Sequence, residues 1–416
     1  MIFVHHHRQS AFWGSLAVYL LVLNFTKAQT TSSITHTPMT LSNTTLDSIR
    51  VKYHLPGLAA ARIKIQHHDE IRINSRATGV RKFGNDTKLT PRDKFHLGSL
   101  TKAMTATLVA ILIETPHNSL RWNTTVPEAL PHIANIIPAY RNTTLAMLAS
   151  HYAGFDDETF LKQELPLWMK ISNRTYTPVK GRRLLAERAF SYEPATRPGS
   201  AYAYSNLGYM LIGHIIDTHS PPGCGSWEEF LFRYLFGPLR MDGCGLGPVP
   251  QRTPHSISNP WPHLPGHPEP IPVPLDTDNP PTLGPAGTVH CTIDSYAKFL
   301  ALHVEGSLGN QTPLLPASAF TVLHTPYRTL AGLPPSGDKG PTDWYTPGAW
   351  ALRNNPSVGG GYLSHDGSNR MNYAVGIVAP GVREAYFVGT NVGEADAAAN
   401  EVAIGLLTHT LGFNLG

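Results

Sequence analysis

The apolar positions of the chain predict an outer sheet that is interrupted by a block of helices. Near the beginning, Leu55 to Ile65 and Ile71 to Val80 have the composition of two strands, and the polar residues 67–69 between them predict a hairpin turn. Strand-like stretches return near the end of the chain, at Ala349 to Arg353, Tyr362 to His365, Met371 to Val378 and Ala385 to Thr390.

The middle of the chain carries helical patterns. The residues from Ser99 to Glu114 are helix formers whose apolar side chains cover nearly the whole helix surface, which is typical of a buried helix. Further helices are expected at Tyr209 to Thr218, Trp227 to Phe236, Ile293 to Val304 and Ala395 to Leu411. Between Pro248 and Pro285, 13 of 38 residues are proline, so we expect a long extended loop without regular ladders or helices.

The first 28 residues have the features of a secretory signal. An apolar stretch of 13 residues, Ala11 to Leu23, follows Arg8 and precedes Thr26-Lys27-Ala28. About 20 apolar residues are needed to span a bilayer, so this stretch is too short for a transmembrane helix. We therefore expect a signal peptide over residues 1–28, with an uncleaved signal anchor as the alternative, and a flexible leader over residues 29–45. The mature protein is then expected to be extracellular, without a stable membrane span.

The composition agrees with secretion. Charged residues make up only 15% of the chain, below the roughly 25% of average soluble proteins, and glycans on Asn-x-Ser/Thr sequons would supply the missing surface polarity. The candidate glycosylation sites are Asn43, Asn85, Asn123, Asn142, Asn173 and Asn310. The formal net charge is only +4 and no basic stripe is visible, so nucleic-acid binding has no electrostatic support.

The three cysteines predict one disulfide in an oxidising compartment. Cys224 and Cys244 can close a turn-rich loop of 20 residues, which leaves Cys291 as an odd, buried thiol. The cysteine spacing fits no zinc pattern, and neither His-Glu-x-x-His nor His-x-His-x-Asp occurs. We therefore expect no metal site and no cofactor.

One Ser-x-x-Lys motif is well placed to carry nucleophilic chemistry. A lysine three residues after a serine lies one helical turn away on the same face, where a desolvated amine can accept the hydroxyl proton. The motif occurs three times, as Ser99/Lys102, Ser295/Lys298 and Ser336/Lys339. Ser99 is the best candidate because it opens the most apolar helix, whereas Ser336 lies in a loop rich in proline and glycine that offers no rigid support.

Two later motifs complete the candidate site. In Tyr204-Ser205-Asn206 the phenol can relay a proton to a leaving group, while Asn206 orients the substrate and Lys102. In His365-Asp366-Gly367 the glycine permits close approach of a substrate backbone, and the histidine adds a polar or cationic group.

Rival patterns are weaker. Tyr140-Arg141-Asn142 contains a sequon, and Lys82-Phe83-Gly84 precedes the nucleophile in a predicted turn. Ser150 and His151 are adjacent and therefore seldom face each other, so we assign them a structural role. The absence of a Gly-x-Ser-x-Gly elbow from the sequence counts against an ordinary α/β hydrolase.

The ordered motifs resemble the class C β-lactamase, DD-peptidase and esterase group of serine hydrolases, whose signatures run Ser-x-x-Lys, Tyr-x-Asn and Lys/His-x-Gly. The flanking blocks are similar as well: Leu55-Pro-Gly-Leu58, Gly98-Ser-Leu-Thr-Lys102, Leu148-Ala-Ser-His-Tyr-Ala-Gly154, residues 198–213 and Gly284-Pro-Ala-Gly-Thr288. The resemblance covers about residues 50–412.

This resemblance implies a mixed α+β fold, in which an antiparallel sheet flanked by helices is built from both chain ends. A helical insert completes the fold, and the site lies in the cleft between the two parts. The hydrolase domain would span residues 46–412. Its sheet part would lie at about 46–100 and 285–412, its helical part at about 101–247, and the proline-rich loop at 248–285.

The resemblance also implies roles for the motif residues. Ser99 would be the acylated nucleophile, Lys102 and Tyr204 would share general base and acid work, and Asn206 would position the acyl group. The backbone N–H groups of Ser99 and Ser368 would form the oxyanion hole, next to Gly367, with His365 in place of the lysine of many relatives. The partner would be a small-molecule or peptide substrate with an ester or amide bond, lactams and D-amino peptides included; the oligomeric state stays open.

Asp366 departs from the family pattern, which has threonine or serine there. An anion that only accepts hydrogen bonds, next to a histidine that is mostly neutral at pH 7, disfavours an anionic ligand. We therefore expect ester or amide substrates without a nearby carboxylate to be preferred over penicillins, unless strand alternation turns Asp366 away from the cleft.

A second class of function is a catalytically silent binding or structural protein on the same fold. The joint presence of five motif residues favours the enzyme: Ser99, Lys102, Tyr204, Asn206 and Gly367.

Overall fold

The computed structural model describes residues 39–40, 43–66, 70–253, 256–266, 269–336 and 341–412. The expected signal peptide, the expected hairpin turn at 67–69 and Lys339 lie outside the described residues. Within the described ranges, every helix is too short or too polar to cross a membrane.

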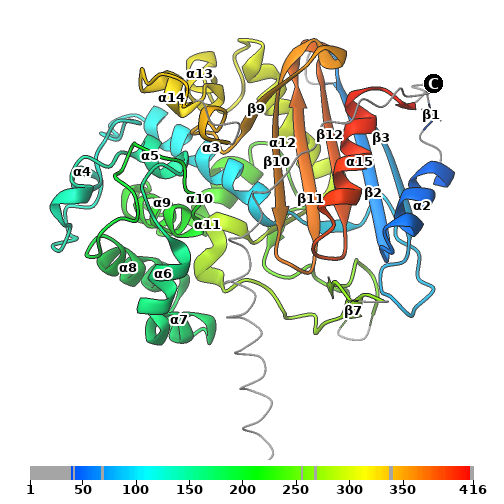
Figure 1. Ribbon diagram of the computed structural model, residues 1–416, viewed down its shortest axis with the longest axis horizontal. Coiled ribbons are helices and arrows are strands. Elements are labelled where there is room, and N and C mark those ends of the chain that lie inside the picture. Colours follow the sequence, from blue (N-terminus) through cyan, green and yellow to red (C-terminus); the bar gives the residue numbers. More distant parts are fainter. Residues whose placement is uncertain are drawn as a thin grey trace, which may run out of the picture.

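A six-stranded antiparallel sheet combines the two ends of the chain (Figure 1). Its strands are β2 (Gly57–Ile65), β3 (Ile71–Gly79), β9 (Ala351–Asn355), β10 (Gly360–Ser368), β11 (Tyr373–Ala379) and β12 (Glu384–Thr390), in the order β3-β2-β12-β11-β10-β9. The mixed α+β fold with both chain ends in one sheet is therefore confirmed. Strand β10 continues beyond the predicted end at His365 to Ser368, so it carries the whole third motif.

Helices cover both faces of this sheet (Figure 1). Ala61, Ile63 and Phe387 pack on one side with α3 (Thr101–Glu114) and α12 (Ile293–Ser307). Alternate residues such as Tyr386 and Val388 pack on the other side with α2 (Asn43–Lys52) and α15 (Asp396–Leu407). Because both faces are buried, the central strands are apolar at nearly every position.

The two ends of the domain differ from the sequence prediction. Helix α2 begins at Asn43, inside the segment 29–45 that the sequence predicts to be a leader, and it buries Leu46 and Ile49. Helix α15 ends at Leu407, and Leu411–Gly412 instead forms the short strand β13, which pairs with β1 (Met39–Thr40). The sequence did not predict α2, because only a few of its residues are apolar. Those residues are buried only when the helix packs against α15 and the sheet.

The helical part fills the middle of the chain. It contains α3 and the helices α4 (Val126–Ala129), α5 (Leu145–Ala149), α6 (Asp157–Gln163), α7 (Leu165–Ser172), α8 (Pro178–Ala189), α9 (Asn206–His219) and α10 (Trp227–Leu231). Helix α10 passes into a π-helical turn over Phe232–Phe236, the rest of the helix predicted there. Arg182 is fully buried between Asp217 and Glu228 and donates two hydrogen bonds to each carboxylate, which ties α8, α9 and α10 together.

The described part of the proline-rich segment is mainly an extended loop, as expected, but it also contains a short ladder and a 3₁₀ turn at Pro281–Leu283. His263–Leu264 (β6) and Ile271–Pro272 (β7) form a two-residue antiparallel pair, because proline is tolerated where its nitrogen faces away from the ladder. The loop is tied to the end of the sheet, since the backbone N–H of Trp261 donates to Arg81 O and that of His263 donates to Met371 O. It ends at α11 (Gly284–Gly287).

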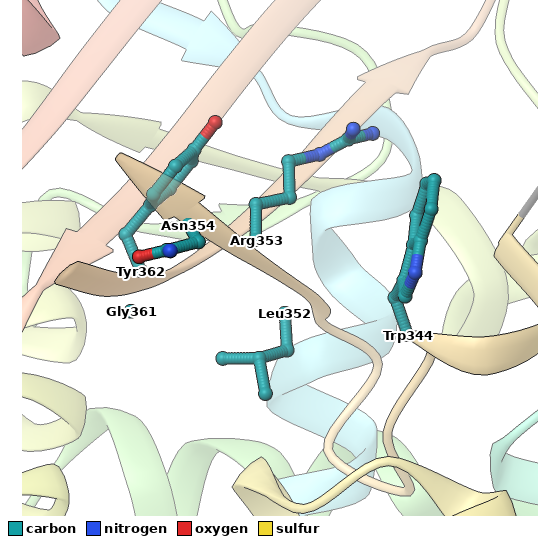
Figure 2. A pocket seen from close by; sticks show the side chains of 6 residues that line it. All are labelled: Trp344, Leu352, Arg353, Asn354, Gly361 and Tyr362. Carbon is teal, nitrogen blue, oxygen red and sulfur yellow. The ribbon is translucent and has the colours of Figure 1, made fainter. Parts of the chain in front are cut away.

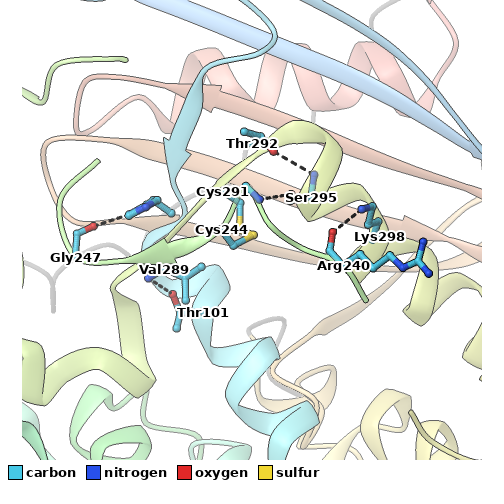
Figure 3. Close-up of a disulfide and its surroundings, with 11 residues drawn as sticks. Thr101, Arg240, Cys244, Gly247, Val289, Cys291, Thr292, Ser295 and Lys298 are labelled. Atoms are coloured by element: carbon cyan, nitrogen blue, oxygen red, sulfur yellow. Dashed lines mark hydrogen bonds between the residues drawn. A yellow bond between two sulfur atoms is a disulfide. The ribbon is translucent and has the colours of Figure 1, made fainter. Parts of the chain in front are cut away.

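The predicted Cys224–Cys244 disulfide is wrong: Cys244 is bonded to Cys291 (Figure 3). Cys224 is a buried free thiol. The reason is a small sheet in which β8 (Val289–Thr292) lies between β4 (Lys94–His96) and β5 (Gly245–Leu246). Gly245 pairs with His290 in antiparallel register, which brings the two cysteine Cα atoms to 4.0 Å. Loop length in the sequence could not show this strand pairing.

Candidate active site

Ser99 lies where the 3₁₀ turn η2 (Gly98–Leu100) passes into α3. Strand β9 stops pairing with β10 at Ser364, and the free edge of β10 beyond that point lies against this turn. The contact is so close that a Cβ on Gly98, whose φ is +51°, would be 2.4 Å from Ser368 N, and a Cβ on Gly367 would be 2.6 Å from Ser99 N. Two glycines therefore allow the backbone amides of the first and third motifs to come together.

Lys102 is fully buried one turn after Ser99, and its Nζ lies 3.0 Å from Ser99 Oγ. It also donates to Asn206 Oδ1 at 2.7 Å and to Ala286 O at 2.8 Å. Burial lowers the pKa of Lys102 to about 7, although nearby carboxylates oppose this shift. A neutral amine has two N–H groups and one lone pair. Asn206 and Ala286 take the two N–H groups, so the lone pair is directed to the Ser99 hydroxyl.

Tyr204 completes the contacts of the nucleophile by donating from its OH to Ser99 Oγ at 2.8 Å. Burial raises the pKa of Tyr204 above its usual value, so the side chain stays a neutral phenol near pH 7. The ring also lies beside the Lys102 amine, with 4.9 Å between Nζ and the ring centroid. The two groups are therefore suited to different roles: Lys102 as the proton acceptor and Tyr204 as a proton donor.

The second motif is held by Asp157, which the sequence did not single out. This carboxylate is 1% exposed and accepts hydrogen bonds from Ser205 Oγ at 2.6 Å, from the Asn206 N–H at 2.7 Å and from the Leu207 N–H at 3.2 Å. Its charge satisfies the N-terminus of α9 and at the same time favours the protonated form of Lys102. The only local signal is an acidic residue at the start of α6, which is common in helices that have no function.

A buried chain of hydrogen bonds joins the second motif to the third. The Ser205 N–H donates to His151 Nδ1 at 3.0 Å, so the proton of His151 is on Nε2, 3.2 Å from the Tyr345 OH. The Tyr345 OH then donates to His365 Nε2 at 3.0 Å, which leaves the His365 proton on Nδ1. Burial lowers the pKa of His151 well below its usual value and that of His365 to about 4.

His365 is therefore an uncharged side chain where many relatives have a lysine. Its Nδ1 is buried and has no hydrogen-bond partner within the described residues. The Ser150–His151 pair is structural, as predicted: the His151 ring bonds Ser205 and Tyr345, and Ser150 Oγ has no partner in the part of the chain that is described. Tyr345 could not be found from the sequence because it lies outside every motif.

Asp366 points to the opposite face of β10. It pairs with Val375, which belongs to the α2 and α15 side of the sheet, and its carboxylate is exposed and accepts a hydrogen bond from the Tyr373 OH at 2.9 Å. Strand alternation has therefore turned Asp366 away from Ser99, the alternative stated above. Its charge still favours the protonated form of Lys102.

Rival motifs have structural contacts instead. Ser295 Oγ accepts a hydrogen bond from the Gly243 N–H, and Lys298 donates to Arg240 O, so these two side chains do not form a catalytic pair (Figure 3). Lys82 covers the ring of Trp261, and Tyr140 is packed in the core. A hollow of about 510 Å³ beside β9 and β10 is lined by Trp344, Leu352, Arg353, Asn354, Gly361 and Tyr362 (Figure 2). No motif residue lines it.

The family is settled by comparison with known proteins. A family model described as Beta-lactamase matches residues 42–414. The chain belongs to the beta-lactamase family. The resemblance inferred from the ordered motifs is thus confirmed, and the fold and the serine hydrolase class of the family follow from it.

Relatives of this beta-lactamase family member include several kinds of hydrolase. Penicillin-binding protein 4 of Amycolatopsis lactamdurans is 25% identical over 374 residues, which cover 89% of each chain. D-amino acid amidase from Ochrobactrum anthropi has a TM-score of 0.65 at 16% identity, with 89% of this chain and 98% of the amidase covered. The class C beta-lactamase from Rhodobacter sphaeroides has a TM-score of 0.64 at 18% identity, with 89% and 99% covered. At such identities the two structures establish the fold.

Proposed function

We propose that this beta-lactamase family member is a secreted serine hydrolase that forms an acyl-enzyme at Ser99 and cleaves ester or amide bonds. One observation carries the proposal: Ser99 Oγ has both a lysine amine at 3.0 Å and a phenol donor at 2.8 Å. A catalytically silent protein would have no need for a fully buried lysine whose pKa is lowered to about 7.

Acylation begins when the neutral amine of Lys102 takes the proton of Ser99 and Oγ bonds to the substrate's carbonyl carbon. The carbonyl π electrons move to oxygen, and the resulting oxyanion is stabilised by the backbone N–H groups of Ser99 and Ser368. The close approach of Gly98 to Ser368 N and of Gly367 to Ser99 N supports this assignment.

The tetrahedral intermediate then collapses with cleavage of the bond to the leaving group. Tyr204 donates its proton to the leaving nitrogen or oxygen and recovers one from the ammonium of Lys102. In deacylation a water molecule loses a proton to Lys102 and bonds to the acyl carbon, and the Ser99 Oγ bond breaks with return of a proton to Oγ. No net proton or electron is gained by the enzyme in the cycle.

The substrate is proposed to lack a carboxylate beside the scissile bond. His365 supplies no positive charge there, because burial lowers its pKa to about 4 and its Nε2 is already occupied by Tyr345. The preference against an anion therefore depends on His365 rather than on a direct contact with Asp366. A D-amino acid amidase among the structural relatives is consistent with amide substrates, since an amino acid amide has no carboxylate beside the scissile bond.

Secretion is part of the proposal. The apolar segment 11–23 has the length of a signal peptide, and the six sequon asparagines that follow the expected signal peptide lie on the exposed surface: Asn43, Asn85, Asn123, Asn142, Asn173 and Asn310. The Cys244–Cys291 disulfide is the type of bond that persists in oxidising compartments. Expression in a eukaryotic secretory host, followed by N-terminal sequencing and glycopeptide mapping of the medium, tests this part; retention of the protein in cells with residues 1–28 intact would contradict it.

A substrate panel tests the enzymatic part. We expect kcat/KM to be higher for 4-nitrophenyl butyrate and for a D-amino acid amide than for the chromogenic cephalosporin nitrocefin. His365→Lys is expected to move the preference toward nitrocefin, because it introduces a cation. A wild-type protein that prefers nitrocefin would overturn the substrate assignment, and one that turns over none of these compounds would favour the silent alternative.

A further inference from the structure

Asp278 in the proline-rich loop is linked by hydrogen bonds to the turn that carries the nucleophile. The Gly98 N–H donates to His96 Nδ1 at 3.1 Å, and His96 Nε2 lies 3.0 Å from Asp278 Oδ2. The side chains of His96 and Asp278 are 1% and 0% exposed. A backbone N–H group can only donate, so His96 Nδ1 must accept from the Gly98 N–H. The neutral imidazole of His96 therefore has its proton on Nε2 and donates it to Asp278.

The second oxygen of the same carboxylate contacts the other side of the site. Asp278 Oδ1 accepts a hydrogen bond from Asn369 Nδ2 at 2.9 Å. Asn369 directly follows Ser368 at the end of β10, just as Gly98 directly precedes Ser99. One carboxylate is thus linked to the residues next to both backbone amides that would form the oxyanion hole.

The loop reaches this position from several anchors. Asn279, the next residue, donates from Nδ2 to Gly287 O at 2.9 Å, close to the carbonyl that Lys102 uses at Ala286. Asn369 is fixed in turn, since its Oδ1 accepts from the Met371 N–H and from Asn372 Nδ2. The Asp278 carboxylate is therefore held between an anchored loop on its own side and an anchored Asn369 on the other.

We propose that Asp278 is a positioning residue that sets the spacing of the oxyanion hole, acting on Ser99 through His96 and Gly98 and on Ser368 through Asn369. The inference rests on the proposed hydrolase function. A transition state that develops negative charge on oxygen is sensitive to small displacements of its donors, whereas substrate binding is less so. We call these two links from Asp278, one through His96 and one through Asn369, the clamp. Loss of the clamp therefore lowers kcat more than it raises KM.

Asp278→Asn tests the clamp with almost no change in shape. An asparagine has one acceptor oxygen, so its NH₂ must face either His96 Nε2–H or Asn369 Nδ2, and two donors oppose each other. We expect kcat for 4-nitrophenyl butyrate to fall 10- to 100-fold while KM changes less than threefold, with a parallel loss in the rate of labelling by a fluorophosphonate.

The double variant Asp278→Asn/Asn369→Asp again gives each hydrogen bond of residue 278 one donor and one acceptor. The amide oxygen introduced at position 278 would accept from His96, and the amide NH₂ would donate to the carboxylate introduced at position 369, which also keeps its bonds from Met371 and Asn372. We expect kcat to return to within about fivefold of the wild type. Rescue of this kind depends on hydrogen-bond direction, which a general loss of packing would not reproduce.

Asp93→Asn is the matched control, because Asp93 is 2% exposed and its carboxylate pairs with Arg81 rather than with His96 or Asn369. It is expected to lower the melting temperature without changing kcat. If Asp278→Asn does not fold, Asn369→Ala, which breaks the link to β10 without opposing donors, is expected to lower kcat by itself.

Failure of the proposed hydrolase function can be distinguished from failure of the role assigned to Asp278. A wild-type protein that neither turns over the ester nor labels at Ser99 would contradict the proposed function before any variant is compared. An active wild type whose folded Asp278→Asn variant has an unchanged kcat, or whose double variant is no better than the single one, would overturn the role of Asp278.

Discussion

Lys102 Nζ lies 3.0 Å from Ser99 Oγ in a fully buried position. Its other two partners, Asn206 Oδ1 and Ala286 O, are oxygens that only accept hydrogen bonds. A neutral amine therefore accepts the serine proton, whereas an ammonium group would donate a third hydrogen bond to Oγ and leave the nucleophile without a base.

The first prediction is a pH profile governed by Lys102. Its pKa is lowered to about 7, so the amine is protonated below that pH and neutral above it. We expect kcat/KM to rise with pH through about 7 and then to level off. Asp366→Asn removes a carboxylate that favours the ammonium form, so the midpoint moves to lower pH. Asp242→Asn, at an exposed carboxylate in another part of the chain, is the control and leaves the midpoint in place; a profile that falls with pH through 7 would exclude Lys102 as the base.

The second prediction separates acid from base work. Tyr204→Phe removes the donor that lies 2.8 Å from Ser99 Oγ. Because this donor protonates the leaving group, we expect kcat/KM to fall by about 10²–10⁴ for amides and much less for 4-nitrophenyl esters, whose leaving group needs no proton. Tyr202→Phe, which removes the hydroxyl group of a neighbouring tyrosine, is the control. Equal losses on both substrate types would assign Tyr204 a different role.

The third prediction concerns the close approach of β10 to the nucleophile turn. A Cβ at Gly367 would lie 2.1 Å from Leu97 O, so Gly367→Ala must displace one of the two backbones. We expect activity to fall at least 100-fold while circular dichroism shows a folded protein. Gly361→Ala on the same strand has its nearest atom at 3.8 Å and serves as the control. A Gly367→Ala variant with wild-type kcat would show that these amides are not the oxyanion hole.

The fourth prediction is the cysteine pairing. Non-reducing peptide mapping should recover a linked peptide with Cys244 and Cys291, and Cys224 as a free thiol. Replacing both bonded cysteines by alanine opens a loop of 47 residues and should cost about 4 kcal/mol of unfolding free energy in urea titrations, on the chain-entropy model. Cys224→Ala should cost clearly less, and a larger loss from that variant would contradict the pairing.

Local patterns in the sequence predicted most of the fold and the three motifs. Ser99 and Lys102 are one helical turn apart, so their contact needs only the helix that the apolar pattern of residues 99–114 indicates. The third motif was predicted at the end of a strand, but that strand was expected to stop at His365. The sequence therefore did not show that alternation along β10 puts His365 and Gly367 on one face and Asp366 on the other.

Contacts between distant segments could not be predicted. Cys244 reaches Cys291 only because β5 and β8 pair, and Tyr345 reaches both His151 and His365 only after the sheet and the helical part have packed together. Asp278 lies in a loop whose prolines exclude regular structure without revealing its path. Tyr345 and Asp278 have no periodic or motif signal of their own.

The most direct test of the account is the identity of the acylated residue. Wild-type protein is incubated with a fluorophosphonate, and the adduct is located by peptide mass spectrometry, with Ser99→Ala and Ser295→Ala treated in parallel. We expect label on Ser99 in the wild type and in Ser295→Ala, and none in folded Ser99→Ala. Label that persists in Ser99→Ala, or that appears on another serine of the wild-type protein, would contradict the assignment of Ser99 as the nucleophile.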